Sequence, residues 1–127
     1  PTLRNKKNQP LEKKLTMLIY MNEDWEESDT GQCELWNDEM SQCVKTVPPT
    51  FNTCLIFECT NTSYHGVPKV TFKNKNRINL TFNFLLDSQT KELRPKAYFV
   101  PRPEDAHIKN FKEIAHKRAY GDDKGTY

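Results

Sequence analysis

Apolar and polar side chains alternate along "RINLTFNFLLD", residues 77–87. A period of two is the pattern of a β-strand whose two faces meet different surroundings. One face is apolar, and we expect it to pack in the core; it carries Ile78, Leu80, Phe82 and Phe84. The other face is polar along its length, with Arg77, Asn79, Thr81 and Asn83. This polar face is either exposed to solvent or the lining of a polar pocket.

Shorter stretches rich in β-branched and aromatic residues predict further strands. They are "LTMLIYMN" at 15–22, "CELW" at 33–36, "CLIFEC" at 54–59, which we expect to be buried, and "KAYFV" at 96–100. "CVKTVPPTFN" contains a proline pair, which favours an edge strand or a loop. "TNTSYHGVP" is rich in turn residues and leaves room for a short extended piece. The acidic run that begins at Glu23 is interpreted as a solvated loop.

The last part of the chain, residues 101–121, has a helical pattern. Ile108, Phe111 and Ile114 recur at helical spacing, Pro103 suits a first turn, and Gly121 suits a stop. Short strands followed by one helix predict a mainly β domain, either a sandwich or a jelly roll. The pattern divides the chain into a polar loop or arm at 1–14, a strand-rich region at 15–101, and a helix with its tail at 102–127.

Composition narrows the possible partners. The chain has 127 residues, 28% of them charged, and a formal net charge of +2, which is too small to indicate a nucleic-acid partner. Apolar runs are all shorter than the roughly 18 residues of a membrane span, so no membrane partner is expected. The four cysteines form no C-x-x-C pair, which argues against a zinc ribbon. We favour reduced thiols and a cytoplasmic setting, although an even count also permits two disulfides.

Four segments in order resemble one enzyme family. They are "LTMLIYMNEDW", "GQCELWN", "FNTCLIFECTNTSYHGVP" and "NRINLTF", and together they run from about Leu15 to Phe84. This series is similar to the Fe(II)- and 2-oxoglutarate-dependent dioxygenases of the prolyl 4-hydroxylase-like group. The resemblance implies a double-stranded β-helix, which is a jelly roll, followed here by a C-terminal helix.

The resemblance implies a role for five residues. His65 in "SYHGV" matches the second iron-binding histidine of the family and is therefore the expected metal ligand and catalytic residue. Arg77 matches the basic residue that binds the distal carboxylate of 2-oxoglutarate, and Tyr20 in "YMN" matches a tyrosine beside it. Thr81 matches a hydroxyl of the same pocket. Asn79 stands where other members have a serine, which is a departure from the family pattern.

These residue types suit the implied chemistry. Such oxygenases hold Fe(II) with two histidines and one carboxylate and leave positions open for 2-oxoglutarate and O2. Arginine offers a fixed fork of donors that matches a carboxylate. The resemblance implies hydroxylation of a protein or peptide substrate, with peptidyl proline as the leading choice and a small molecule as the other, together with release of succinate and CO2. The resemblance also implies ascorbate as an accessory cofactor.

The family's H-x-D/E motif, which supplies the other iron ligands, is missing from residues 1–14. We therefore expect the motif to lie upstream of Pro1, so that this chain is the C-terminal part of a jelly roll and is inactive alone. The alternative is a non-catalytic jelly-roll binding module that has lost the metal site. A small secreted domain held by disulfides is the third hypothesis. Because an incomplete jelly roll exposes strand edges, we expect the isolated chain to aggregate.

Overall fold

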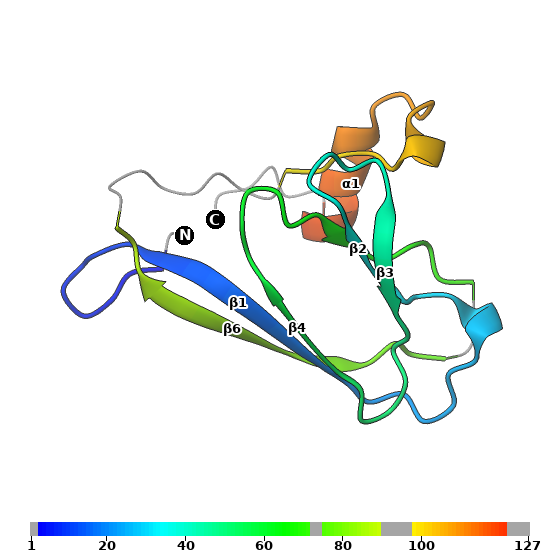
Figure 1. The fold of residues 1–127 in the computed structure, drawn as a ribbon, viewed down its shortest axis with the longest axis horizontal. Helices are drawn as coiled ribbons and strands as arrows, with labels where there is room; N and C mark the ends of the chain where they lie inside the picture. The colour runs from blue at the N-terminus through cyan, green and yellow to red at the C-terminus, as the bar shows by residue number, and fades with distance from the viewer. Residues whose placement is uncertain (1–2, 72–74, 90–97, 122–127) are drawn as a thin grey trace. The chain divides into compact units, whose positions relative to one another are not determined.

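The computed structural model describes residues 3–71, 75–89 and 98–121. Figure 1 shows its strands and helices in chain order. The strands are β1 (Leu11–Tyr20), β2 (Cys33–Trp36), β3 (Cys43–Val47), β4 (Cys54–Glu58), β5 (His65–Gly66) and β6 (Asn79–Asp87). The helices are the 3₁₀ turns η1 (Glu27–Asp29) and η2 (Pro103–Asp105) and the α-helix α1 (Phe111–Tyr120).

The strands of the described residues form two three-stranded sheets. One sheet has the order β4-β1-β6 and the other has the order β3-β2-β5. β1 pairs with β4 in antiparallel register from Leu15 opposite Glu58 to Ile19 opposite Cys54. β2 pairs antiparallel with β3 and also with β5, where Leu35 lies opposite His65. The protein is therefore mainly β, with the two sheets of a jelly roll, as the sequence predicted.

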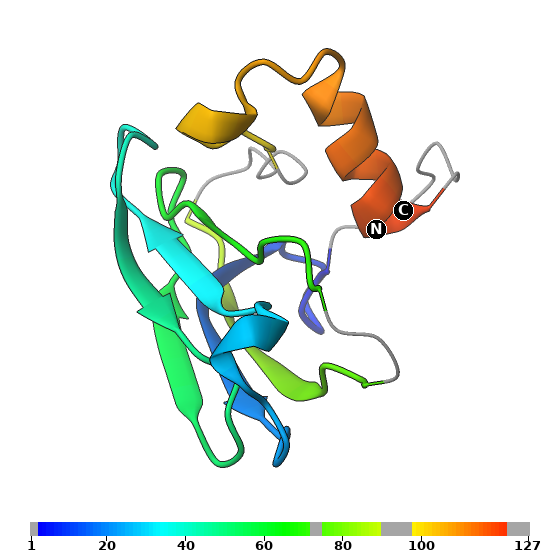
Figure 2. The same cartoon turned by 90° about the vertical axis from the view of Figure 1, so that its right-hand side faces the viewer.

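The core lies between the two sheets. Tyr20 of β1 is 0% exposed, Cys33 of β2 is 2% exposed and Leu55 of β4 is 9% exposed. Half-buried side chains from four strands pack against them, namely Leu18, Leu35, Val47 and Phe57. Figure 2 shows η1 on the near side, where the chain passes from the end of β1 to the start of β2. This turn lies next to the candidate site.

Contacts divide the chain into two compact units, one of residues Lys13–Leu85 and one of Pro1–Glu12 with Leu86–Tyr127. The first unit holds both sheets. In the second, the Asn5 amide donates to Asp87 at 2.6 Å and the Ser88 N–H donates to the Pro10 carbonyl at 2.8 Å. The Leu11 N–H also donates to the Leu3 carbonyl at 2.9 Å. The two backbone bonds extend β1 to Leu11, four residues before the predicted first residue, Leu15.

The predicted helix over 101–121 divides into two pieces. η2 begins at Pro103, and α1 begins only at Phe111, because Asn110 before it adopts a left-handed conformation with φ of 60°. The predicted stop is confirmed, since Gly121 has φ of 73° and its N–H donates to the Lys117 carbonyl at 2.8 Å. Of the strand predicted over 96–100, residues 96–97 lie outside the described residues and 98–100 form no strand. No helix of the described residues is long and apolar enough to cross a membrane.

The prediction for the apolar face of "RINLTFNFLLD" is wrong. Ile78, Leu80, Phe82 and Phe84 are 52%, 50%, 45% and 48% exposed. On the polar face, Arg77 and Asn79 are half-buried, and Arg77 reaches Tyr20 of β1. Thr81 and Asn83 are exposed, although Asn83 accepts from the Thr16 hydroxyl of β1. β1 and β4 already fill the space between the sheets with Tyr20, Leu18 and Leu55. The pocket-lining interpretation therefore fits the start of this face, at Arg77 and Asn79, and the solvent-exposed interpretation fits the rest.

The exposed apolar face of β6 continues across its sheet. Leu15 and Met21 of the β1 segment and Ile56 of β4 are also exposed. β4 was predicted as a buried strand, but only its alternate residues face the core. A contiguous apolar surface of this kind is a site for association or aggregation.

We expect the double variant Phe82→Thr, Phe84→Thr to bind less of a hydrophobic dye and to self-associate less than the parent chain. Its free energy of unfolding should change by roughly 0.5 kcal/mol or less per site, because both rings face water. Leu55→Ala is the matched control on the buried face and should cost about 2–5 kcal/mol. Dye fluorescence, sedimentation and denaturant unfolding measure these effects. An equal loss of stability in both variants would mean that the outer face is packed.

Candidate functional site

Arg77 lies just before β6, half-buried, and its guanidinium has partners on three sides. Its Nε–H donates to the Gly31 carbonyl at 2.7 Å and its Nη1 donates to Asn79 Oδ1 at 3.1 Å. Its Nη2 reaches the Tyr20 hydroxyl at 3.4 Å, and its central carbon lies 5.1 Å from the centre of the Tyr20 ring. The structure thus brings together the predicted residues Arg77, Tyr20 and Asn79.

Tyr20 is the last residue of β1 and forms the buried wall of this site. Burial raises the pKa of its phenol from 10.0 to about 12, the neighbouring Cys33 adds to this, and the Arg77 charge opposes it. Burial likewise raises the pKa of the Cys33 thiol. The phenol therefore stays neutral at physiological pH and can both donate and accept a hydrogen bond.

Polar side chains of β6 continue the site inward from Arg77. Asn79 accepts from Arg77 and donates through Nδ2 to the Thr81 hydroxyl at 2.8 Å. Asn79, which departs from the serine of other family members, thus holds Arg77 in place through its Oδ1. Thr81 itself is exposed. Further along, the Thr16 hydroxyl donates to Asn83 Oδ1 at 3.1 Å and lies 3.2 Å from Cys59 Sγ.

The hydrogen bonds of Arg77 determine what it can bind. A guanidinium has five N–H donors, and three are engaged by Gly31, Asn79 and Tyr20. Among the described residues, one N–H on each terminal nitrogen is left without a partner. Two parallel donors from the ends of an arginine fork match the two oxygens of a carboxylate. The donors that Arg77 keeps are therefore on its terminal nitrogens, because Nε is held by Gly31.

His65 comes from β5, on the other sheet. It is exposed, its Nδ1 lies 2.8 Å from the Ser63 carbonyl, and its ring centre lies 4.5 Å from that of Phe57. Since a carbonyl can only accept, Nδ1 is the donor of this bond, and in the neutral ring Nε2 is then the nitrogen with the lone pair. A carbonyl that fixes the tautomer in this way is the usual support of a metal-binding histidine. His65 therefore fits one position of a metal site.

The described side chains do not assemble a complete iron triad. Across residues 3–71, 75–89 and 98–121, no group of three or more histidine, cysteine, aspartate or glutamate side chains is placed to hold a metal ion. All four cysteines are free thiols in the structure. Of the predicted site residues, the described chain places His65 on β5 and brings Arg77, Tyr20 and Asn79 together.

Asn22 is a site residue that the pattern analysis missed. It is 7% exposed, its Oδ1 accepts from the Ile78 N–H at 2.7 Å, and its Nδ2 donates to the Pro49 carbonyl at 2.6 Å. The backbone beside Arg77 is thereby fixed to the end of β1. The signal was present in "YMN", where Tyr20 contacts the Arg77 side chain and Asn22 holds the adjoining backbone.

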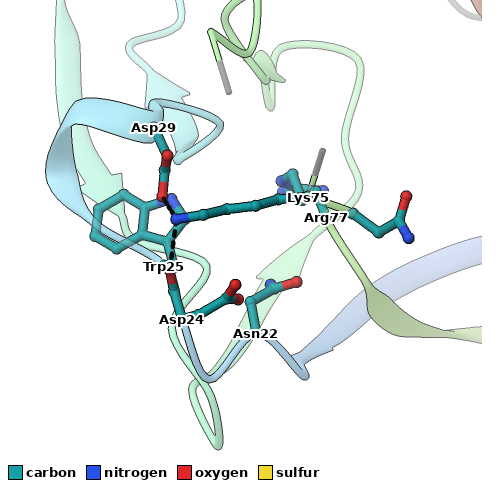
Figure 3. Close-up of a pocket in the computed structure, with 7 residues that line it drawn as sticks. Asn22, Asp24, Trp25, Asp29, Lys75 and Arg77 are labelled. Atoms are coloured by element: carbon teal, nitrogen blue, oxygen red, sulfur yellow. Dashed lines mark hydrogen bonds and ion pairs between the residues drawn. The ribbon is translucent and has the colours of Figure 1, made fainter. Parts of the chain in front are cut away.

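Glu23, Asp24, Glu26 and Glu27 of the acidic run are all exposed, as the interpretation of a solvated loop predicted, and Asp29 just beyond them is buried. Asp29 accepts from the Glu26 N–H at 2.9 Å. It also pairs with Lys75 at 3.0 Å, as Figure 3 shows. The Glu26 N–H, and then Lys75, hold the pKa of the Asp29 carboxyl below its ordinary value. Asp29 in turn raises the pKa of Lys75. The pair therefore remains charged from below the usual range of an aspartate to above that of a lysine.

We expect the stability of the protein to fall between pH 10 and 12 because of Tyr20. The folded phenol keeps its proton to about pH 12, whereas the unfolded one loses it near pH 10.0. The stabilisation is fully present below pH 10 and is lost as pH rises through 12, by roughly 2–3 kcal/mol. Denaturant unfolding at pH 9 and pH 11.5 measures this, with Tyr20→Phe as the control. An equal pH dependence in both proteins would exclude a buried, titrating Tyr20.

Comparison with known proteins agrees with this geometry. The family model of the 2OG-Fe(II) oxygenase superfamily matches residues 3–85, which is well over half of the chain and includes His65, Arg77 and Tyr20. Among curated proteins, prolyl 3-hydroxylase OGFOD1 of Mus musculus is 26% identical over 110 residues. That alignment covers 83% of this chain but only 20% of the relative, so the chain spans about a fifth of that protein's length. The chain belongs to the 2OG-Fe(II) oxygenase superfamily.

Proposed function

We propose that this chain provides the 2-oxoglutarate-binding side of an Fe(II)- and 2-oxoglutarate-dependent dioxygenase that hydroxylates peptidyl proline. The proposal rests on the hydrogen bonds of the Arg77 guanidinium. Its Nε, one hydrogen of Nη1 and one of Nη2 are bonded to Gly31, Asn79 and Tyr20. The remaining terminal donors suit the distal carboxylate of 2-oxoglutarate.

In this proposal the surrounding residues set the geometry of the carboxylate site. Tyr20 presents a neutral phenol beside the guanidinium, so it can donate to a carboxylate oxygen without adding negative charge. Asn79, oriented by Thr81, holds one edge of the fork. A charge-assisted, two-point contact with a fixed arginine is strong and directional.

His65 is the residue we assign to iron. Nδ1 donates to the Ser63 carbonyl, so Nε2 is the atom that would bind the metal. When bound, iron supplies the centre at which 2-oxoglutarate and O2 react. The Phe57 ring limits the rotation of the imidazole. The assignment of proline in a protein as substrate rests on the name of the mouse relative, and ascorbate as accessory cofactor rests on the family.

The second candidate is a non-catalytic jelly-roll module that binds 2-oxoglutarate or another dicarboxylate. The observation that favours it is that, among the described residues, His65 has no neighbouring group of metal ligands beside it. Both candidates use Arg77 in the same way. They differ in whether His65 takes part in chemistry.

We expect Arg77→Gln to weaken 2-oxoglutarate binding about 10- to 100-fold, because two charged hydrogen bonds to the carboxylate are lost. Arg77→Lys should recover part of the affinity, since a lysine keeps the charge but not the two-point contact. Lys69→Gln is the matched control, because it removes one positive charge from an exposed position nearby. Isothermal titration calorimetry measures the dissociation constants. Equal affinities in Arg77→Gln and Lys69→Gln would refute the carboxylate site.

We expect the complete gene product that contains this chain to form succinate from 2-oxoglutarate when Fe(II) and a proline-containing peptide are supplied. Replacing His65 with alanine should reduce succinate formation at least 100-fold and leave the affinity for 2-oxoglutarate in the absence of metal unchanged. Succinate release and peptide mass measure the outcome. Binding of 2-oxoglutarate without any succinate would favour the binding module.

A further inference from the structure

Two segments that are distant in sequence are joined beside the candidate site. The first is the stretch from Asp24 to Gly31, which we call the 24–31 loop, and the second consists of the described residues 69–71 and 75–77. The Thr30 hydroxyl donates to the Lys69 carbonyl at 2.9 Å, and the Thr71 hydroxyl donates to the Ser28 carbonyl at 2.8 Å. The loop thus follows the residues that lead into β6.

Lys75 makes the charged contact between these segments. Its ammonium donates to the Asp24 carbonyl at 2.9 Å and to Asp29 Oδ2 at 3.0 Å. The same Asp29 oxygen accepts from the Glu26 N–H at 2.9 Å, which closes the first turn of η1. Figure 3 shows the Lys75 side chain extended across a shallow hollow toward Asp29. Lys75 therefore holds the loop at two points, at Asp24 through a hydrogen bond and at Asp29 through the ion pair.

The loop ends at Gly31, whose carbonyl accepts the Nε–H of Arg77 at 2.7 Å. Gly31 has φ of 86°, and a Cβ there would lie 3.0 Å from Val70 Cγ1 and 3.3 Å from Arg77 Cδ. Only glycine lets the backbone approach the arginine this closely in that conformation. The position of this carbonyl is set by the loop. Lys75 holds the loop together with the Thr30–Lys69 and Thr71–Ser28 bonds and with the bond from Trp25 Nε1 to the Thr30 carbonyl at 2.8 Å.

We propose that Lys75 and Asp29 are positioning residues for Arg77. Their ion pair holds the 24–31 loop so that the Gly31 carbonyl occupies Nε, which leaves the terminal nitrogens to face the carboxylate of the co-substrate. The ligand part of this inference rests on the proposed function. The orientation of the guanidinium is a property of the chain itself and can be measured without ligand.

Position and charge make opposite predictions for Asp29. If the two residues acted only through their field, removal of the Asp29 charge would make the region more positive and strengthen binding of a dicarboxylate. If they act through position, Asp29→Asn releases the loop and weakens binding. Lys75→Met weakens binding in both cases, so the sign of the Asp29→Asn effect separates the two explanations.

The experiment follows the Arg77 Nε–H resonance by ¹H–¹⁵N NMR in the 127-residue chain, assigned by its loss in Arg77→Lys. We expect this proton to exchange slowly in the parent chain, in Lys75→Arg and in the control Lys69→Met. Its exchange should become at least tenfold faster in Lys75→Met and Asp29→Asn. Backbone amide spectra establish that each variant is folded. Since Lys75 is partly exposed, Lys75→Met keeps the test valid if Asp29→Asn does not fold.

The same samples are titrated with 2-oxoglutarate, and we expect a roughly five- to tenfold weaker affinity in both Asp29→Asn and Lys75→Met. Unchanged Nε–H exchange in the two variants, or tighter binding in Asp29→Asn, overturns the positioning role. If the parent chain binds no 2-oxoglutarate but the variants lose Nε–H protection, the positioning role stands and the proposed function fails. If binding depends on Arg77 and not on Lys75 or Asp29, the proposed function stands and this inference fails.

Discussion

The placement of a guanidinium beside the inner faces of two sheets is the constraint on which the rest of this structure depends. A cation taken out of water is costly unless its N–H groups are paired. Here a loop carbonyl, a strand amide and a buried phenol each take one donor of Arg77. Those partners come from the 24–31 loop, from β6 and from β1. Pairing of the arginine therefore requires three separate segments to meet at one point.

This requirement explains features that would otherwise look unrelated. Asn22 bonds both to the backbone at Ile78 and to the turn at Pro49, so the end of β1 and the approach to β6 keep a fixed separation. Gly31 has the positive φ that brings its carbonyl to Nε. Lys75 and Asp29 hold the loop that carries Gly31. Each contact is local, yet all of them act on the orientation of one side chain.

The polar interior has a consequence on the other side of the sheet. Because strand side chains alternate, placing Arg77 and Asn79 beside Tyr20 turns Ile78, Leu80, Phe82 and Phe84 to the opposite face, where all four are exposed. The exposed apolar side chains of β4-β1-β6 therefore lie on the face opposite the polar contacts of Arg77.

The sequence by itself determined the mainly β character, the positions of β2 and β4, the edge role of β3 and the stop at Gly121, because these follow from local propensity and turn chemistry. Alternation also identified the two faces of β6, and "YMN", "SYHGV" and Arg77 marked the family. Only the tertiary structure decided which face of β6 points inward, since a period of two is symmetric until other strands fill the core. It alone revealed that Asn79 accepts from Arg77 and that Asp29 and Gly31, which follow the acidic run, join the residues around Arg77. Those roles depend on the hydrogen bond between Gly31 and Arg77 and on the ion pair between Asp29 and Lys75, across separations that no local pattern encodes.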